Sequence, residues 1–204
     1  MKRLCALLLV AGCSTPPDPS VTRPTDAFFA RLHALCGQAF AGRVVSTEAA
    51  DADMRGKPLV MHLRECSADT IRIPFHVGED RSRTWVVSRH GILWHSRETS
   101  GFSSFLTLKH DHRHRDGTRD VLTNYGGDTG DGGNSRRQSF PADTESRSLF
   151  MNKGSPASVK NIWTLEFASG RIFAYELRRP GRYFRAEFDL TRAVPAPPPP
   201  WGSR

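Results

Sequence analysis

The sequence of 204 residues lacks the patterns that mark the most familiar catalytic sites. It contains no Gly-x-Ser-x-Gly nucleophile elbow and no His-Glu-x-x-His zinc helix. Cysteine is scarce, with four residues and none in a Cys-x-x-Cys pair, so the usual spacing of a redox-active dithiol is absent. These absences give no support for nucleophilic or redox catalysis and favour a protein without enzymatic activity.

No apolar stretch reaches the length of about 18 residues that a permanent membrane-spanning helix needs. Residues 4–11 are apolar and follow two basic residues, which is typical of a signal peptide. The stretch ends in Val10-Ala11-Gly12-Cys13, which resembles the lipobox of bacterial lipoproteins. The resemblance implies that residues 1–12 are a lipoprotein signal peptide and that Cys13 becomes the lipidated first residue. The alternative is an ordinary secretory signal peptide that happens to contain a cysteine.

The resemblance also implies a location in the cell. Ser14 follows the cysteine, and under the sorting rule of enterobacterial lipoproteins it resembles an outer-membrane address. We therefore expect a lipid-anchored envelope protein on the periplasmic face of the outer membrane. Loss of Lys2 and Arg3 with the signal peptide would reduce the formal net charge from +8 to +6.

The basic residues of the remaining chain are spread out and form no block of the nucleic-acid-binding type. No nucleic-acid partner is expected. A mild positive charge does favour weak attraction to an anionic component of the envelope.

Two proline-rich segments bound the body of the chain. Residues 13–25 predict a semi-rigid tether, because proline favours extended polyproline conformation. Residues 193–204 include four consecutive prolines and predict a disordered tail. The intervening residues 26–192 are enough for one domain with its own core.

Two cysteines remain in that domain once Cys5 leaves with the signal peptide and Cys13 is lipidated. In an oxidising envelope, Cys36 and Cys66 are expected to form a disulfide. The loop of about 30 residues would stabilise the fold by roughly 3–4 kcal/mol in the chain-entropy model.

The hydrophobic pattern predicts one helix followed by a series of strands. Phe28, Phe29, Leu32 and Leu35 share one helical face in residues 26–36. From there on apolar and polar residues alternate, which indicates strands with one buried and one wet face. A short helical turn is predicted near residues 143–150. Turn signals separate the strands at Gly56-Lys57-Pro58, His90-Gly91, Asp116-Gly117, Ser169-Gly170 and Pro180-Gly181.

About ten antiparallel strands joined in sequence order must hide their edges, and a closed barrel does so most completely. The sequence therefore predicts an all-β, up-and-down barrel with one N-terminal helix, and the pattern resembles the lipocalin-like (calycin) architecture. The lipocalin Gly-x-Trp signature is missing, and a two-sheet sandwich is the alternative. The body also resembles uncharacterised proteobacterial secreted proteins.

The stretch LKHDHRHRDG places His110, His112 and His114 on one face of a predicted strand. Three interpretations stay open. Two imidazoles could bind Zn²⁺ or a similar metal with a third ligand from His90, His95 or Asp120, which would make the chain a metal-binding protein or a metal-dependent enzyme. The strip could form a polar barrel mouth that contacts a ligand. It could also be an exposed hairpin end, since charged residues alternate with the histidines.

Aromatic residues of the predicted strands could line a cavity for a small hydrophobic ligand or fill a solid core. The candidate lining residues are Trp85, Trp94, Phe105, Trp163, Phe173, Tyr175 and Phe184. Arg178, Arg179, Arg182 and Arg185 flank one turn and could form an anion-facing rim. The stretch GGDTGDGG (residues 126–133) could offer Asp128 and Asp131 to Ca²⁺, but a flexible loop is the preferred interpretation. The sequence names no substrate and no obligatory cofactor.

Overall fold

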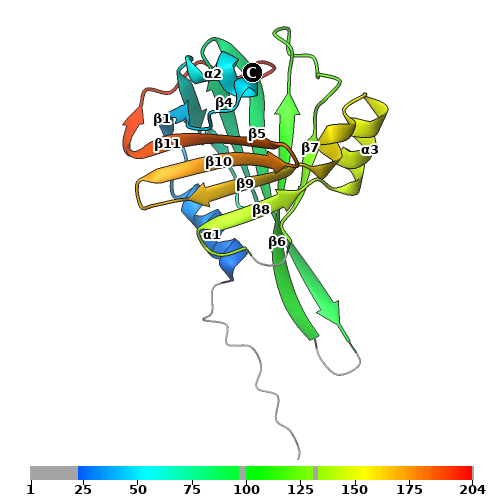
Figure 1. Ribbon diagram of the computed structural model, residues 1–204. Coiled ribbons are helices and arrows are strands. Elements are labelled where there is room, and N and C mark those ends of the chain that lie inside the picture. Colours follow the sequence, from blue (N-terminus) through cyan, green and yellow to red (C-terminus); the bar gives the residue numbers. More distant parts are fainter. Residues whose placement is uncertain (1–22, 97–99, 131–132, 204) are drawn as a thin grey trace, which may run out of the picture.

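The computed structural model describes residues 23–96, 100–130 and 133–203, and these form a nearly closed antiparallel barrel (Figure 1). Cys13 and the signal peptide lie outside the described residues. Within those ranges ten strands follow one another in a single path, β7-β6-β5-β4-β2-β1-β11-β10-β9-β8, and the two-residue β3 pairs with β4. The predicted all-β up-and-down barrel is confirmed, and the sandwich alternative is not adopted. The strands are β1 (Ala39–Val44), β2 (Leu59–His62), β3 (Glu65–Cys66), β4 (Thr70–Val77), β5 (Asp80–His95), β6 (Ser100–His112), β7 (Tyr125–Asp128), β8 (Arg137–Pro141), β9 (Ile162–Phe167), β10 (Ile172–Arg179) and β11 (Arg182–Val194).

The helices are few and short in the described part of the chain. They are α1 (Pro24–His33), α2 (Ala52–Arg55) and α3 (Thr144–Asn152), with two 3-10 turns at Ala49–Asp51 and Pro156–Lys160. The helical turn predicted near residues 143–150 corresponds to α3. Among the described residues, no helix has the length and apolar character needed to cross a bilayer.

The first and last strands close most of the barrel, since β1 pairs with β11. The strands β7 and β8 are the two ends of this strand order. They lie next to each other but are joined by few backbone hydrogen bonds, and we call this contact the seam. There the Asp143 N–H donates to the Gly126 carbonyl at 2.9 Å. The buried Ser146 hydroxyl accepts from the Gly126 N–H at 2.7 Å and donates to its carbonyl at 2.9 Å. A side chain at Gly127 would lie only 1.7 Å from the Pro141 carbonyl oxygen, so the close approach at the seam requires glycine.

Helix α1 lies at one end of the barrel and buries its apolar face there (Figure 1). The Phe28 ring meets the Phe167 ring of β9 edge-on, with centroids 5.5 Å apart. The helix begins at Pro24, two residues before the predicted start, because proline suits the first helical position. Neither Thr25 nor Asp26 caps it. This end of the barrel is therefore closed by protein.

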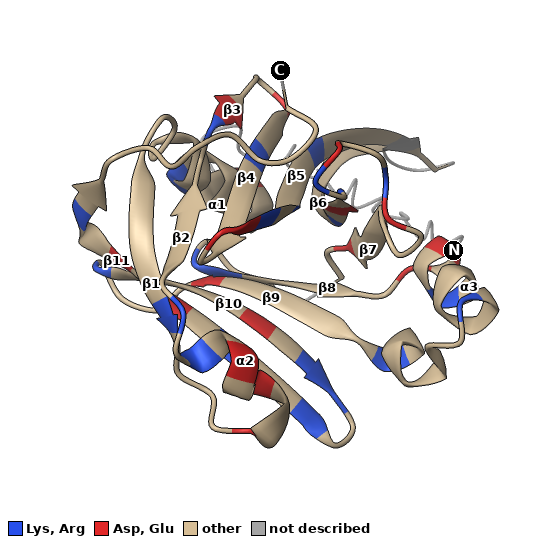
Figure 2. Ribbon diagram, turned by 90° about the horizontal axis from the view of Figure 1, so that it is seen from above, with Lys and Arg blue, Asp and Glu red and all other residues tan. Residues whose placement is uncertain are grey.

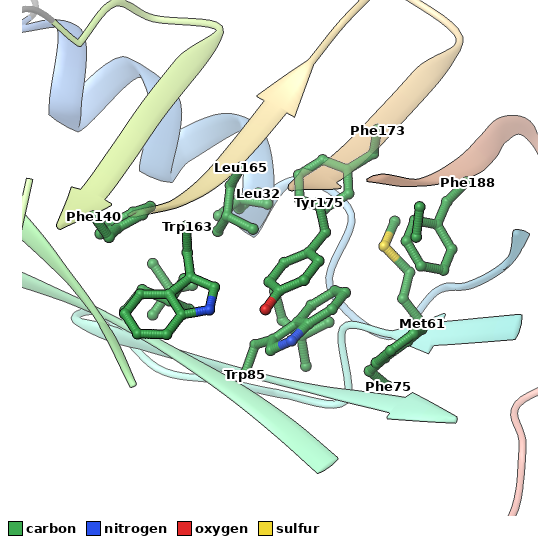
Figure 3. Close-up of a cluster of buried hydrophobic side chains, with 14 of the residues drawn as sticks. Leu32, Met61, Phe75, Trp85, Phe140, Trp163, Leu165, Phe173, Tyr175 and Phe188 are labelled. Carbon is green, nitrogen blue, oxygen red and sulfur yellow. The ribbon is translucent and has the colours of Figure 1, made fainter. Parts of the chain in front are cut away.

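The interior of the barrel is filled by side chains, many of them aromatic (Figure 3). Trp85 stacks on Tyr175 with ring centroids 4.4 Å apart and on Phe75 with ring centroids 4.8 Å apart. Most of the residues expected to line a cavity are buried in this core: Trp85, Trp163, Phe173, Tyr175 and Phe184. Of the two interpretations of these aromatic residues, the filled core fits their burial.

Two of the expected lining residues do not belong to this set. Phe105 is half-buried on the outer side of the sheet, where it stacks on His90 at 4.8 Å. It points outwards because its neighbour Leu106 points inwards and side chains alternate along a strand. Trp94 lies in β5, and its side chain is outside the described set.

The predicted disulfide between Cys36 and Cys66 is present, with Cα atoms 6.3 Å apart. It joins the segment after α1 to the short strand β3. The Gly37 N–H donates to the Leu63 carbonyl at 2.7 Å in the same region. The closing helix is thus fixed to the barrel covalently as well as by packing.

The C-terminal segment differs from the predicted disorder. Strand β11 continues to Val194, and the chain beyond it lies against the barrel. The Trp201 backbone N–H donates to the Arg81 carbonyl at 3.1 Å, and the Arg81 guanidinium donates to the Pro199 carbonyl at 3.2 Å. A proline-rich segment leaves its carbonyls free to accept such bonds, which explains why it can follow the barrel surface.

Candidate ligand-binding site at the open end of the barrel

The end of the barrel opposite α1 contains two adjoining hollows, of about 120 Å³ and about 340 Å³. Both are lined by His112, Tyr125, Tyr175 and Leu177, and we call this group the mouth. The smaller hollow reaches down to His110 and the Trp85 core. His110 and His112 of the histidine strip therefore lie where the packed interior meets an opening.

His110 forms the floor of the mouth and is almost fully buried, with 3% of its surface exposed. Its Nδ1 lies 3.2 Å from the Tyr125 carbonyl oxygen, which can only accept, so Nδ1–H is the donor. In the neutral ring Nε2 is then an acceptor, and it receives the Tyr175 hydroxyl at 2.9 Å. Burial, reinforced by His112, lowers the pKa of His110 to about 3. Tyr175 keeps its oxygen lone pairs available at the hollow.

His112 lies one layer above and is partly buried. Its Nε2 is 3.0 Å from the Tyr125 hydroxyl. Burial, followed by the charge of Arg83, lowers the pKa of His112 to about 4. Burial also raises the pKa of Tyr125 to about 12 and holds the pKa of Tyr175 well above its usual range. At neutral pH the mouth therefore consists of neutral rings that offer hydrogen bonds but no charge.

Positive charge is supplied by arginines at the rim. In Figure 2 basic residues gather at the β10–β11 turn. Arg83 pairs with Asp80, and Arg182 pairs with Glu48 and Asp51. Arg179 differs from both, since it contacts only the Ser158 hydroxyl at 3.0 Å and the Asn161 side-chain oxygen at 3.3 Å. Among the described residues it has no carboxylate partner, so its charge is available to a ligand.

Only part of the predicted arginine rim forms. Arg179 and Arg182 line the hollows. Arg178 lies over the Tyr183 ring at 5.2 Å. Arg185 points to the outer face, where it pairs with Glu166, Glu176 and Glu187. Because the side chains of β11 alternate, the buried neighbours Phe184 and Ala186 place Arg185 outside.

The three histidines do not form a metal centre in the described chain. His114 is exposed, and both ring nitrogens of His110 are engaged by Tyr125 and Tyr175. No group of three or more histidine, cysteine, aspartate or glutamate side chains in the described ranges could hold a metal ion. The burial of His110 also rules out a wholly exposed hairpin end. The polar-mouth interpretation fits His110 and His112, and the exposed end fits His114.

Of the other predicted metal ligands, Asp120 lines the larger hollow together with His112, and its side chain accepts from the Leu122 N–H at 2.9 Å. His90 and His95 lie outside both hollows. His90 stacks on Phe105, and His95 bonds the Ser100 hydroxyl at 2.7 Å. In the glycine-rich stretch, Asp128 accepts from the Thr107 hydroxyl at 2.6 Å, and Asp131 lies outside the described residues.

No family model, no curated protein and no solved structure matches this chain. The functional interpretation of the mouth rests on its own geometry.

Sequence patterns did not reveal two of the residues that line the hollows, Tyr125 and Arg83. Tyr125 opens the four-residue strand β7, which is too short for a recognisable alternation. It is nevertheless followed by Gly126 and Gly127, and such a pair is a signal of close backbone approach. Arg83 lies on a long strand among several polar residues, and its place at the opening depends on register with β6.

Proposed function

We propose that this protein is a lipid-anchored accessory protein of the bacterial envelope that binds a small ligand at the barrel mouth without catalysing a reaction. The signal-peptide pattern and Cys13 support the anchor, and the Cys36–Cys66 disulfide is compatible with an oxidising compartment. The outer membrane is the proposed location, following the residue after Cys13.

The observation that carries the binding proposal is the juxtaposition of an aromatic, neutral floor with an unpaired cation at the rim. Tyr125 and Tyr175 supply ring surface and hydroxyl groups. Arg179 supplies a positive charge without a carboxylate partner in the described chain. This combination suits a small molecule that has an apolar, preferably planar, part and an anionic group.

The packed interior defines the size of that ligand. Hollows of about 120 Å³ and 340 Å³ are smaller than the cavity that a long acyl chain would fill. We therefore propose binding at the opening and not inside the barrel, and we retain the anionic envelope component as the preferred source of the ligand.

A direct test uses 2-naphthoate, which joins an aromatic ring system to a carboxylate, and follows binding by NMR. We expect saturable shifts of the His112 and Tyr125 ring signals. Arg179→Gln should weaken binding about tenfold, because a charge-assisted hydrogen bond contributes about 1.5–3 kcal/mol. Arg31→Gln, an exposed arginine on α1, should leave the affinity unchanged.

Two results would contradict the proposal. One is the absence of shifts at the mouth at millimolar probe. The other is equal weakening by Arg179→Gln and Arg31→Gln, which would indicate a general charge effect.

A further inference from the structure

The hairpin formed by β5 and β6 extends well beyond the barrel as a two-stranded arm (Figure 1). Strand β4 pairs with β5 only as far as Ser88, and β7 pairs with β6 only from Thr107 onwards. Beyond these points β5 and β6 continue as a two-stranded ladder as far as His95 opposite Ser100, and we call residues 90–96 and 100–105 the arm. A lone two-stranded ribbon is only marginally stable in water.

The arm exposes large apolar side chains on both of its faces. Leu93 is 72% exposed, and it lies opposite Phe102, which is 43% exposed. Ile92 is 47% exposed and points to the other face, because neighbouring residues alternate along a strand. Residues 90–96 and 100–105 contain no lysine, arginine, aspartate or glutamate, and the charged residues of the whole segment 90–105 are Arg97 and Glu98. Exposed strands of soluble proteins usually carry such charges to prevent unwanted pairing, so this composition indicates a surface that is covered in use.

The position of the arm relative to the start of the described chain indicates which surface it contacts. The described chain begins at Arg23, whose guanidinium donates to the Phe102 carbonyl at 3.0 Å and lies 4.6 Å from the centre of the Phe102 ring. The chain therefore enters the domain beside the arm. Cys13 is only ten residues upstream, and ten residues span at most about 35 Å when fully extended. A lipid on Cys13 would hold this end of the barrel, and not the mouth, next to the bilayer.

We propose that the arm is a second membrane contact, which inserts Ile92, Leu93 and Phe102 into the bilayer interface beside the lipid anchor. Gly91 makes the apolar face continuous, since a Cβ there would lie 2.5 Å from the Phe102 ring. The two contacts together fix the orientation of the barrel, with α1 towards the membrane and the mouth away from it. This inference deepens the proposed anchoring and rests on it for the position of the arm.

The test uses the lipidated full chain with Leu93→Cys carrying a polarity-sensitive nitrobenzoxadiazole label. The protein is reconstituted in vesicles of phosphatidylethanolamine and phosphatidylglycerol. We expect a blue shift of the emission and strong quenching by a nitroxide on the lipid acyl chain. The matched control is Val121→Cys, because Val121 is also apolar, is 66% exposed and lies beyond the mouth strands. Its label should stay in water. Labels that both report water on an anchored chain would overturn the inference.

A second measurement separates the arm from the anchor. The mature chain from residue 13 with Cys13→Ser has neither lipid nor signal peptide, so its partition to the same vesicles measures the arm. Replacing both Leu93 and Phe102 with aspartate should lower that partition at least about tenfold, since apolar insertion is lost. An unchanged partition would overturn the inference.

Self-association offers a further distinction. A dimer of the Cys13→Ser chain that Leu93→Asp dissociates would also overturn the inference, since a second copy would then cover the arm. If the native chain is not attached through Cys13, the anchoring proposal fails, and the vesicle partition still reports on the arm.

Discussion

At the residue scale, the mouth depends on His110 being neutral and fixed in one tautomer. Its Nδ1–H donates to the Tyr125 carbonyl, and its Nε2 accepts the Tyr175 hydroxyl. A protonated ring would carry a second N–H towards Tyr175 and place a charge in the core. The chemistry of the floor therefore follows from desolvation of one imidazole.

This arrangement predicts a specific pH dependence. Burial lowers the pKa of His110 to about 3, whereas the unfolded chain takes up that proton near the ordinary value of about 6.5. Below pH 6.5 the unfolded state binds more protons, so the free energy of unfolding should fall by about 1.4 kcal/mol per pH unit for this histidine alone. Above pH 7 this histidine should cause no change of the free energy of unfolding with pH.

NMR titration of the His110 ring signals checks the cause directly. The signals should remain unchanged from pH 8 to pH 5. A titration midpoint near 6.5 would show that the ring is hydrated and would contradict the described floor.

Single residues also show where sequence patterns mislead. His90-Gly91 carries a turn signal, yet β5 runs through it to His95. The glycine is needed there because the Phe102 ring of the neighbouring strand occupies the space of a side chain. From the sequence alone, a glycine that leaves space for a side chain of the neighbouring strand cannot be distinguished from a glycine in a turn.

At the element scale, the barrel is weakest where β7 meets β8. The strands on either side are joined by full ladders, whereas this seam depends on Ser146 at the start of α3 and on the glycines of β7. Asp143 is the N-cap of helix α3, because its side chain accepts a hydrogen bond from the Ser146 N–H at 2.8 Å. The cap thus places Ser146 against Gly126.

Ser146→Ala should therefore destabilise the fold by about 1–3 kcal/mol, because it leaves the buried Gly126 N–H and carbonyl without their side-chain partner. Denaturant unfolding at neutral pH measures the change. The matched control is Ser148→Ala on the same helix, where the side chain is exposed and the effect should be under about 0.5 kcal/mol. Equal effects of the two substitutions would contradict the role of Ser146 in the seam.

Alternation and turn residues predicted most of the elements, because their signals are local. The period of two identified the strands from Ile162 onwards, and the helical spacing of Phe28, Phe29 and Leu32 identified α1. The disulfide followed from the count of cysteines. The packed interior could not be predicted, since inward aromatic residues read the same whether they fill a core or line a cavity. Here Trp85, Tyr175 and Phe75 stack on one another and fill it.

The candidate site, too, could be predicted only in part from local sequence patterns. Leu106, Leu108 and His110 alternate along β6 and are all buried on its inner face. The charged neighbours favoured solvent, but Asp111 pairs with Arg72 and Arg113 on the outside of the strand. Those charges pair with one another on the outer face, so the inner face carries the neutral rings of His110 and His112. Pairing between distant strands decides this, and no local pattern contains it.

At the scale of the whole molecule, the two ends of the barrel differ in chemistry. One end is closed by α1 and carries the arm and the point where the chain enters. The other carries the mouth and its arginine rim. We propose that the first end faces the membrane and the second faces the aqueous envelope, so that anchoring and ligand binding do not compete for the same surface.

Attachment through Cys13 determines which end of the barrel faces the membrane, and fractionation of the native host measures it most directly. The chain should be found in the membrane fraction after a carbonate wash, and Cys13→Ser should move it to the soluble fraction. Cys5→Ser, a cysteine inside the proposed signal peptide, should remain with the membranes as the matched control. Equal membrane attachment of the native chain and Cys13→Ser, or a native chain found in the soluble fraction, would contradict the account.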